Sequence, residues 1–402
     1  MTTDRQPSNL PVPSTVSEVS WIWEAPEDSR VEWVLPTSHG AVVHLGDGAI
    51  GLDTGSGEEL WRYRIDTSVA DVALTPDGSR TVVSAYGWAA VLDTDTGEEE
   101  YVFRYNPEEN PGWRDDELKI DTAGVVTDLG LVTTSGNGSS ISLTPWNEEE
   151  TGWTTEPSIC ATGSGEPKIH QGIATSERLT LIGSCTNSHH VLIGLDPKTG
   201  EELWRLDSSE EGIYEENYNY AVLDDMAVHQ NIAPLRGTSV FDVNEGEIIS
   251  DDLPDEMHNR LLRILPDGYL SVRTYEDDGE TFLDYELRDF TDQVQKSITA
   301  QDQNLGSPIN HFLSLDDSFL KLTLDEETEE PRIISVYDWG ETGPTTQISL
   351  PVEMDIFSGL RNPGLVALEL AVGPGRFESA PGAVLVREFP EKGYSQRIVG
   401  LS

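Results

Sequence analysis

Residues 51–61 read GLDTGSGEELW, and residues 194–204 read GLDPKTGEELW. A third copy at 91–101 reads VLDTDTGEEEY. All three fit one pattern: a small residue, any residue, Asp, two residues, Ser or Thr, Gly, two Glu, any residue and an aromatic residue. Self-similarity of this kind is typical of repeat architectures. One structural unit therefore recurs along the chain.

The pattern predicts a strand, a tight turn and a second strand. The Asp side chain can cap backbone amides of the turn, and Gly accepts a positive φ. The aromatic residue of the second strand can lie flat against the neighbouring unit, burying a large ring. The predicted docking positions are Asp53, Gly57 and Trp61, then Asp93, Gly97 and Tyr101, then Asp196, Gly200 and Trp204.

Weaker copies of the pattern continue along the chain, at 142–153, 240–249, 285–295 and 336–348. The last residues, Val399-Gly400-Leu401, resemble the start of the first copy. The anchors recur at about 50 residues, which suits a propeller of four-stranded blades. We therefore predict an all-β fold, an eight-bladed β-propeller, with seven blades as the alternative.

Composition agrees with an all-β fold. The 402 residues are 37% hydrophobic, and 36 Gly and 23 Pro interrupt short apolar runs that are rich in Val, Ile, Leu, Tyr and Trp. No long run has the apolar spacing of a helix. We expect a single propeller domain over residues 20–402.

The two ends of the chain predict how the ring closes. The final repeat lacks an outer strand, and SWIWEAP at 20–26 resembles ELWRYRI at 59–65. We expect residues 21–24 to supply the outer strand of the last blade, which leaves no open edge there. Residues 1–19 are polar with three prolines and predict a flexible linker. They show no signal peptide or membrane span, so the protein is cytoplasmic or an anchor precedes this linker.

The motif D-x-x-[ST]-G-x-x-x-W, with a strand before it, resembles the quinoprotein alcohol dehydrogenase-like propellers, also called pyrroloquinoline-quinone-like (PQQ-like) or tryptophan-docking repeats. The resemblance covers about residues 20–402. The acidic, Trp-containing style is similar to actinobacterial extracytoplasmic members, many of which follow one membrane helix. The resemblance implies two kinds of protein: dehydrogenases that hold the quinone and calcium in a central channel, and cofactor-free members that bind other proteins.

We expect the non-catalytic kind, a binding scaffold without a cofactor. The chain lacks vicinal cysteines, C-x-x-C-H, G-x-S-x-G, H-E-x-x-H and a phosphate loop. Residues 93–98 lack the twelfth-position Glu of an EF-hand, and His189-His190 fit a hairpin tip better than a metal site. No catalytic, cofactor-binding or metal-binding residue is predicted. The alternative is a PQQ- and calcium-dependent dehydrogenase of alcohols or sugars, and a polysaccharide lyase or hydrolase is a third reading.

The formal net charge of −48 argues against nucleic acid and against direct contact with anionic lipids. It serves solubility or reflects adaptation to high salt. We expect a monomer that binds a protein or small ligand on one face. The longest irregular connections are 107–117, 208–220 and 371–382. The first two carry the aromatic residues Trp113, Tyr214, Tyr218 and Tyr220.

The two cysteines, Cys160 and Cys185, predict a disulfide, with two unrelated buried thiols as the alternative. A disulfide implies an oxidising compartment. We therefore expect an extracytoplasmic, cell-surface or secreted domain, attached to a membrane only through an anchor outside this sequence. Free cysteines would indicate the cytoplasm.

Overall fold

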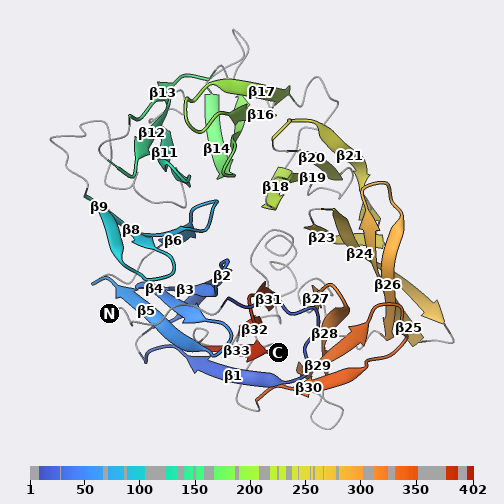
Figure 1. The fold of residues 1–402 in the computed structure, drawn as a ribbon. Coiled ribbons are helices and arrows are strands. Elements are labelled where there is room, and N and C mark those ends of the chain that lie inside the picture. Colours follow the sequence, from blue (N-terminus) through green and yellow to red (C-terminus); the bar gives the residue numbers. More distant parts are fainter. Residues whose placement is uncertain are drawn as a thin grey trace. The chain divides into compact units, whose positions relative to one another are not determined.

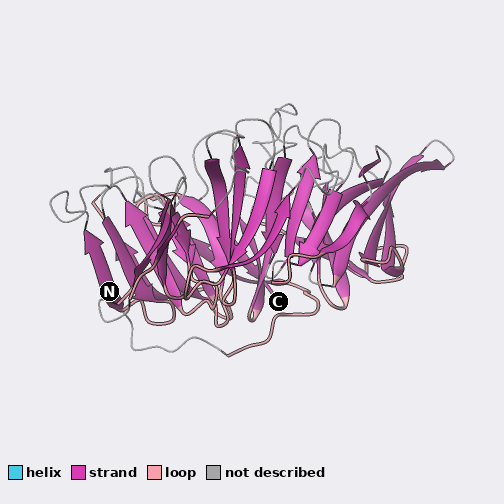
Figure 2. Ribbon diagram, turned by 90° about the horizontal axis from the view of Figure 1, so that it is seen from above, coloured by secondary structure: helices cyan, strands magenta, loops and turns pink. Residues whose placement is uncertain are grey.

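The computed structural model describes residues 9–27, 29–66, 71–85, 88–104, 124–134, 140–147, 151–157, 167–185, 190–207, 218–223, 226–231, 238–242, 244–253, 255–256, 259–265, 267–277, 280–301, 312–324, 331–351, 377–387 and 396–402. Every regular element among these residues is a β-strand (Figure 2). In this part of the chain, no helix has the length and apolar character needed to cross a membrane. The all-β prediction is confirmed.

The chain divides into two compact units, which we describe separately. The first combines residues 3–62 with 253–402, and the second covers 63–252. In the described residues the strands form seven four-stranded sheets and one five-stranded sheet (Figure 1). Paired strands are antiparallel, as short connections between neighbours require.

The sheets of the first unit have the orders β2-β3-β4-β5, β22-β23-β24-β25-β26, β27-β28-β29-β30 and β1-β33-β32-β31. Their strands are β1 (Val19–Glu24), β2 (Val31–Pro36), β3 (Ala41–Leu45), β4 (Gly48–Asp53), β5 (Glu58–Arg64), β22 (Asp255–Glu256), β23 (Asn259–Leu265), β24 (Gly268–Asp277), β25 (Glu280–Asp289), β26 (Val294–Gln301), β27 (Phe312–Ser314), β28 (Ser318–Leu324), β29 (Pro331–Asp338), β30 (Thr346–Ser349), β31 (Phe377–Ala380), β32 (Ala383–Arg387) and β33 (Arg397–Leu401).

The second unit has four sheets, each of four strands in chain order. Its strands are β6 (Asp71–Leu74), β7 (Arg80–Ala85), β8 (Trp88–Asp93), β9 (Glu99–Arg104), β10 (Gly124–Val126), β11 (Gly130–Thr134), β12 (Ile141–Pro145), β13 (Thr154–Thr155), β14 (Pro167–Ala174), β15 (Leu179–Cys185), β16 (His190–Leu195), β17 (Glu202–Asp207), β18 (Tyr218–Leu223), β19 (Met226–Asn231), β20 (Thr238–Asp242) and β21 (Ile248–Leu253).

The first strand of the chain completes the sheet that holds the last strand. β1 pairs with β33 in the register Trp21↔Gly400, Ile22↔Val399 and Trp23↔Ile398. Residues 21–24 therefore occupy the predicted place, as the outer strand beside the end of the chain. The pairing covers the edge that β33 would otherwise expose.

Consecutive sheets share apolar cores within each unit. In the first unit, Leu320 and Ile334 of the β27–β30 sheet pack with Val384 of the next sheet, and all three are fully buried. In the second unit, Ile141 packs in one cluster with Leu179 of the following sheet. Side chains alternate between the two faces of a strand, so each sheet can contribute to two such cores.

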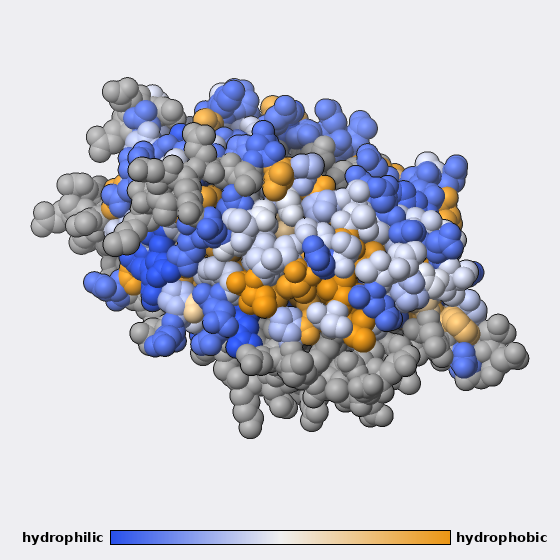
Figure 3. All heavy atoms as spheres, turned by 60° about the horizontal axis from the view of Figure 1, so that its bottom comes forward, coloured by the Kyte–Doolittle hydropathy of each residue, from blue (hydrophilic) through white to orange (hydrophobic). Residues whose placement is uncertain are grey.

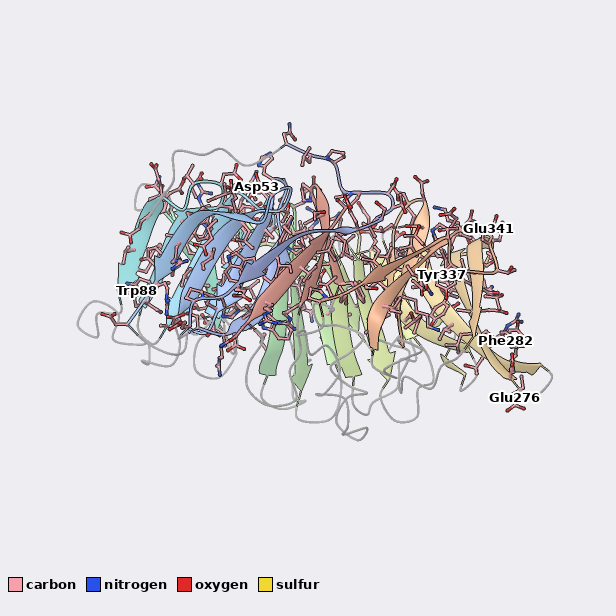
Figure 4. The ribbon with its side chains drawn as sticks, turned by 90° about the horizontal axis from the view of Figure 1, so that it is seen from below. Asp53, Trp88, Glu276, Phe282, Tyr337 and Glu341 are labelled. Carbon is pink, nitrogen blue, oxygen red and sulfur yellow. The ribbon has the colours of Figure 1, made fainter. Side chains whose placement is uncertain are left out.

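The antiparallel order gives every sheet two different ends. Connections from the first to the second strand and from the third to the fourth strand lie at one end, and the other connections lie at the opposite end. The turn that contains Asp53 connects β4 to β5, the third and fourth strands of their sheet, so it lies at the end that also holds the connection between the first two strands. Figure 4 shows Asp53 and Glu341 near one edge of the first unit and Glu276 and Phe282 near the other.

The segment before β1 differs from the flexible linker expected over 1–19. Val16 is 3% exposed and lies in the core of the β27–β30 and β31–β33 sheets. The carbonyl oxygen of Ser14 accepts a hydrogen bond from the Asp317 N–H (3.1 Å), and that of Pro11 accepts one from the Gly382 N–H (2.8 Å). A buried apolar side chain and main-chain hydrogen bonds thus hold a stretch whose composition predicts a linker. Residues 1–8 lie outside the described part.

Candidate functional site

The first-copy turn is built around one carboxylate. Asp53 Oδ1 accepts hydrogen bonds from the N–H groups of Gly55 (2.9 Å) and Ser56 (3.1 Å). The turn closes with Gly57 at a φ of 73°, a conformation that costs L residues with a side chain about 1 kcal/mol or more. The Asp and Gly positions of the repeat are therefore fixed by local backbone chemistry.

The other copies use the same chemistry. Asp93 Oδ1 accepts from the Thr96 N–H (2.8 Å), and Asp196 Oδ1 accepts from the Lys198 N–H (2.7 Å). The weaker copy at 240–249 has the same bond, because Asp242 Oδ1 accepts a hydrogen bond from the Asn244 N–H (2.7 Å). The closing glycines also share a positive φ: 67° at Gly97, 71° at Gly200 and 70° at Gly246.

Tryptophans connect successive sheets by resting on these turns. The Trp21 indole Nε1–H donates to the Thr54 carbonyl oxygen (2.8 Å), and a Cβ placed on Gly57 would lie 2.6 Å from the Trp21 ring. Trp153 repeats the arrangement: its Nε1–H donates to the Pro197 carbonyl oxygen (2.9 Å), and its ring covers Gly200. Each such glycine thus serves both the turn and the close approach of an indole.

The Trp204 ring makes the corresponding contact with the next turn. A Cβ on Gly246 would lie 2.5 Å from this ring. Trp61 is 1% exposed. Tyr101 is partly buried and belongs to an apolar cluster with Val126 and Trp146.

A second set of glycines makes room for the indoles inside their own sheets. Gly194 lies opposite Trp204 and Gly400 opposite Trp21 in the strand registers. A Cβ on either glycine would lie 2.1 Å from the indole. In the copy at 91–101 the residue opposite Tyr101 is Val91. Sequence reasoning missed this coupling, although the change from G…W to V…Y between copies is its visible signal.

Several positions singled out in the sequence fall outside the described residues. These are 107–117, 208–217, 371–376, His189 and Cys160. The disulfide therefore stays a prediction, with Cys185 at the end of β15. Tyr218 and Tyr220, expected in a loop, lie in β18. Among the described residues, no group of three His, Cys, Asp or Glu side chains is placed to hold a metal ion.

Two first-to-second-strand turns of the second unit are joined by carboxylates. The Asp77 backbone N–H donates to Asp128 Oδ1 (2.9 Å). Burial raises the pKa of Asp128, and hydrogen bonds from Asp77 N–H and Ser176 offset only part of this effect. At Asp77 burial also raises the pKa, but hydrogen bonds from Thr75 and Ser79 outweigh it and lower the pKa overall. The negative charge of Asp77 adds to the rise in the pKa of Asp128.

A buried arginine of the first unit lies over the ring of an exposed tryptophan. Arg387, at the end of β32, is 6% exposed, and its guanidinium carbon lies 4.7 Å from the centre of the Trp33 ring. Burial lowers the pKa of Arg387 to about 10, against the field of Glu378 and Glu32. Arg387 remains a cation at neutral pH, and the contact is a cation–π interaction.

The first unit also exposes apolar side chains on its outer wall. Ile22 of β1 is 49% exposed. Figure 3 brings the β1 side forward and shows apolar residues gathered over part of it, among hydrophilic neighbours. Glu276 at the end of β24 and Glu280 at the start of β25 are also exposed.

Comparison with known proteins shows the fold. No family model matches the chain, and no curated protein matches it. The crystal structure of the WD40 domain of SCAP from fission yeast is similar at a TM-score of 0.51 and 10% identity, over 95% of this chain and 98% of that one. A chain of the mitotic checkpoint complex matches at a TM-score of 0.42 and 11% identity, over 85% and 96%. The match to the SCAP domain shows that the fold is similar to that of WD40-type β-propellers.

Proposed function

We propose that this chain is a β-propeller that acts as a non-catalytic scaffold for protein interactions. The observation that carries the proposal is the tryptophan-on-turn contact, seen at Gly57, Gly200 and Gly246. At these three places it joins two neighbouring sheets through a partly buried ring, and at Gly57 and Gly200 the indole also donates a hydrogen bond to the turn. Sheets joined in this way form a rigid support for loops and strand edges, and propellers form their binding surfaces from such loops and edges.

The finer architecture is part of the same proposal. The eight sheets are the blades of one ring, closed where β1 pairs with β33. Similarity to a WD40 domain over 95% of the chain supports a single propeller. The tryptophan motif supports the PQQ-like type, used without quinone or calcium. A monomeric, extracytoplasmic domain with a Cys160–Cys185 disulfide and an anchor outside this sequence completes the proposal.

The scaffold role is tested by partner identification followed by binding of purified proteins. The immobilised full chain is used to capture partners, and each candidate is then purified and titrated into the chain by calorimetry. We expect at least one purified protein to bind with a defined stoichiometry. If every purified candidate fails to bind, and the chain instead binds the quinone with calcium and catalyses dye-linked alcohol oxidation, the scaffold proposal is refuted.

A further inference from the structure

The segment before β1, residues 9–18, belongs to no strand but is bound to two turns of the first unit. The Pro11 carbonyl oxygen accepts a hydrogen bond from the Gly382 N–H (2.8 Å) in the turn between β31 and β32. The Ser14 carbonyl oxygen accepts one from the Asp317 N–H (3.1 Å) in the turn between β27 and β28. The two carbonyl groups are three residues apart, which is one turn of a polyproline II helix.

Two apolar side chains of the segment also contact the first unit. Val16 is 3% exposed and lies in an apolar core with Leu313. Leu10 lies against Gly382, because a Cβ on that glycine would be 2.7 Å from Leu10 Cδ1 and 3.1 Å from the Gly55 Cα. Gly382 also has a positive φ of 83°. The surface under the segment is thus formed by turns from three sheets, and a glycine leaves room for Leu10 on it.

Much of the apolar surface of this segment remains in water. Leu10 is 43% exposed and Val12 is 50% exposed, so only Val16 of these three side chains is buried. A segment that served stability alone would gain more by burying all three. Pro11 and Pro13 restrict the backbone to an extended form, which lowers the entropy lost when the segment is ordered on a surface. Main-chain contacts, a preformed extended backbone and one apolar anchor are features of a bound peptide ligand.

The contacts of the segment are separate from the pairing of β1. The N–H groups of Ser17 (2.7 Å) and Glu18 (3.1 Å) donate to the Ser402 carbonyl oxygen. The register of β1 with β33 then begins at Val19. Residues 9–16 can therefore leave the turns while β1 stays paired in its sheet.

We propose that these turns of the first unit bind an extended, proline-containing segment of a partner protein, and that residues 9–16 occupy the site from within the same chain. The inference rests on the scaffold role proposed above and names the kind of segment that the scaffold recognises. The partner segment has the pattern Pro-x-Pro-x-x-apolar, as residues 11–16 do. Its carbonyl oxygens accept from the N–H groups of Asp317 and Gly382, and its apolar side chain takes the place of Val16. The partner must displace residues 9–16, so this segment also controls access to the site.

The probe is a fluorescent peptide with the sequence of residues 9–17, NLPVPSTVS, which contains no charged side chain. It is titrated into two variants of the full chain. Val16→Ser removes the buried anchor, and Val12→Ser is the matched control because Val12 is half exposed. A second peptide, with the same dye, has Ser at the position of Val16. Circular dichroism checks that each variant folds, and Val16→Ala takes the place of Val16→Ser if the latter does not fold.

We expect the peptide to bind the Val16→Ser chain about tenfold more tightly than the Val12→Ser chain, where the tethered segment competes at a high effective concentration. The peptide without the apolar anchor should bind the Val16→Ser chain about tenfold more weakly. Binding should also slow hydrogen–deuterium exchange over residues 312–318 of that chain.

Equal affinity for the two chains, equal affinity of the two peptides, or unchanged exchange over residues 312–318 would overturn the assignment of the site. A purified protein that still binds the chain after such a result would leave the scaffold role standing, so the two proposals fail separately.

Discussion

The glycine opposite Trp204 provides the sharpest test of the packing. A Cβ on Gly194 would lie 2.1 Å from the Trp204 indole. Ordinary carbon contacts are about 3.6 Å, so the ring must move by about 1.5 Å and leave its place over Gly246. Trp204 is partly buried and removes about 150 Å² from water, so losing half of this area at about 25 cal/mol per Å² costs about 2 kcal/mol. Gly194→Val should therefore destabilise the protein by about 2–3 kcal/mol.

The chain itself contains the compensating pair. Val91 lies opposite Tyr101, so Gly194→Val combined with Trp204→Tyr recreates an arrangement already present. We expect the double variant to be more stable than the sum of the single effects predicts, by about 1.5 kcal/mol or more. Urea unfolding followed by circular dichroism measures each free energy.

The control for this cycle is Gly343→Ala, because a Cβ there meets no atom within 4 Å. It should change stability by less than about 0.5 kcal/mol. The reasoning is refuted if Gly194→Val is as mild as this control, or if the two single effects simply add.

Three further predictions concern the turns and the first segment. Asp196→Ala removes the acceptor for the turn amides and should cost about 1–2 kcal/mol in urea unfolding; an unchanged midpoint would contradict the turn account. Asp128→Asn should raise the melting temperature at pH 7 but not at pH 3. A raised carboxyl pKa makes ionisation costlier in the folded state, so the penalty is absent below about pH 4 and grows as the pH rises through the folded pKa. A pH-independent difference would rule this out. Val16→Ala should cost about 2 kcal/mol, whereas Val12→Ala, at a position 50% exposed, should be neutral; equal effects would argue against the buried anchor.

Local chemistry made much of the fold predictable. The Asp and Gly of each turn are required by backbone amides and a positive φ, so three copies sufficed to predict strands, turns and a repeated sheet. The strand β1 beside the end of the chain was predictable as well, because the sequence around Trp21 resembles the sequence around Trp61. Composition, in contrast, misassigned the segment around Val16. Its position depends on a core formed by residues more than 290 positions away in sequence, such as Leu313, which no local pattern reveals.

The pairing of β24 with β25 was not predictable for a related reason. The sequence at 276–280, EDDGE, shows its charges but not its strand pairing. The stacking of Tyr275 on Phe282 depends on cross-strand register, which the sequence alone leaves open. The contact of Gly194 with Trp204 also depends on cross-strand register and was not predicted. The change to Val91 opposite Tyr101 in another copy is the sequence signal that indicates it.

The central claim is that a strand from the start of the chain completes the sheet formed by its end. Hydrogen–deuterium exchange of the full chain, read by mass spectrometry over residues 19–24 and 397–401, tests it most directly. The account predicts slow exchange in both segments, with loss of protection in 397–401 when residues 19–24 are deleted. Exchange of residues 19–24 at the rate of a free peptide in the intact chain would contradict it.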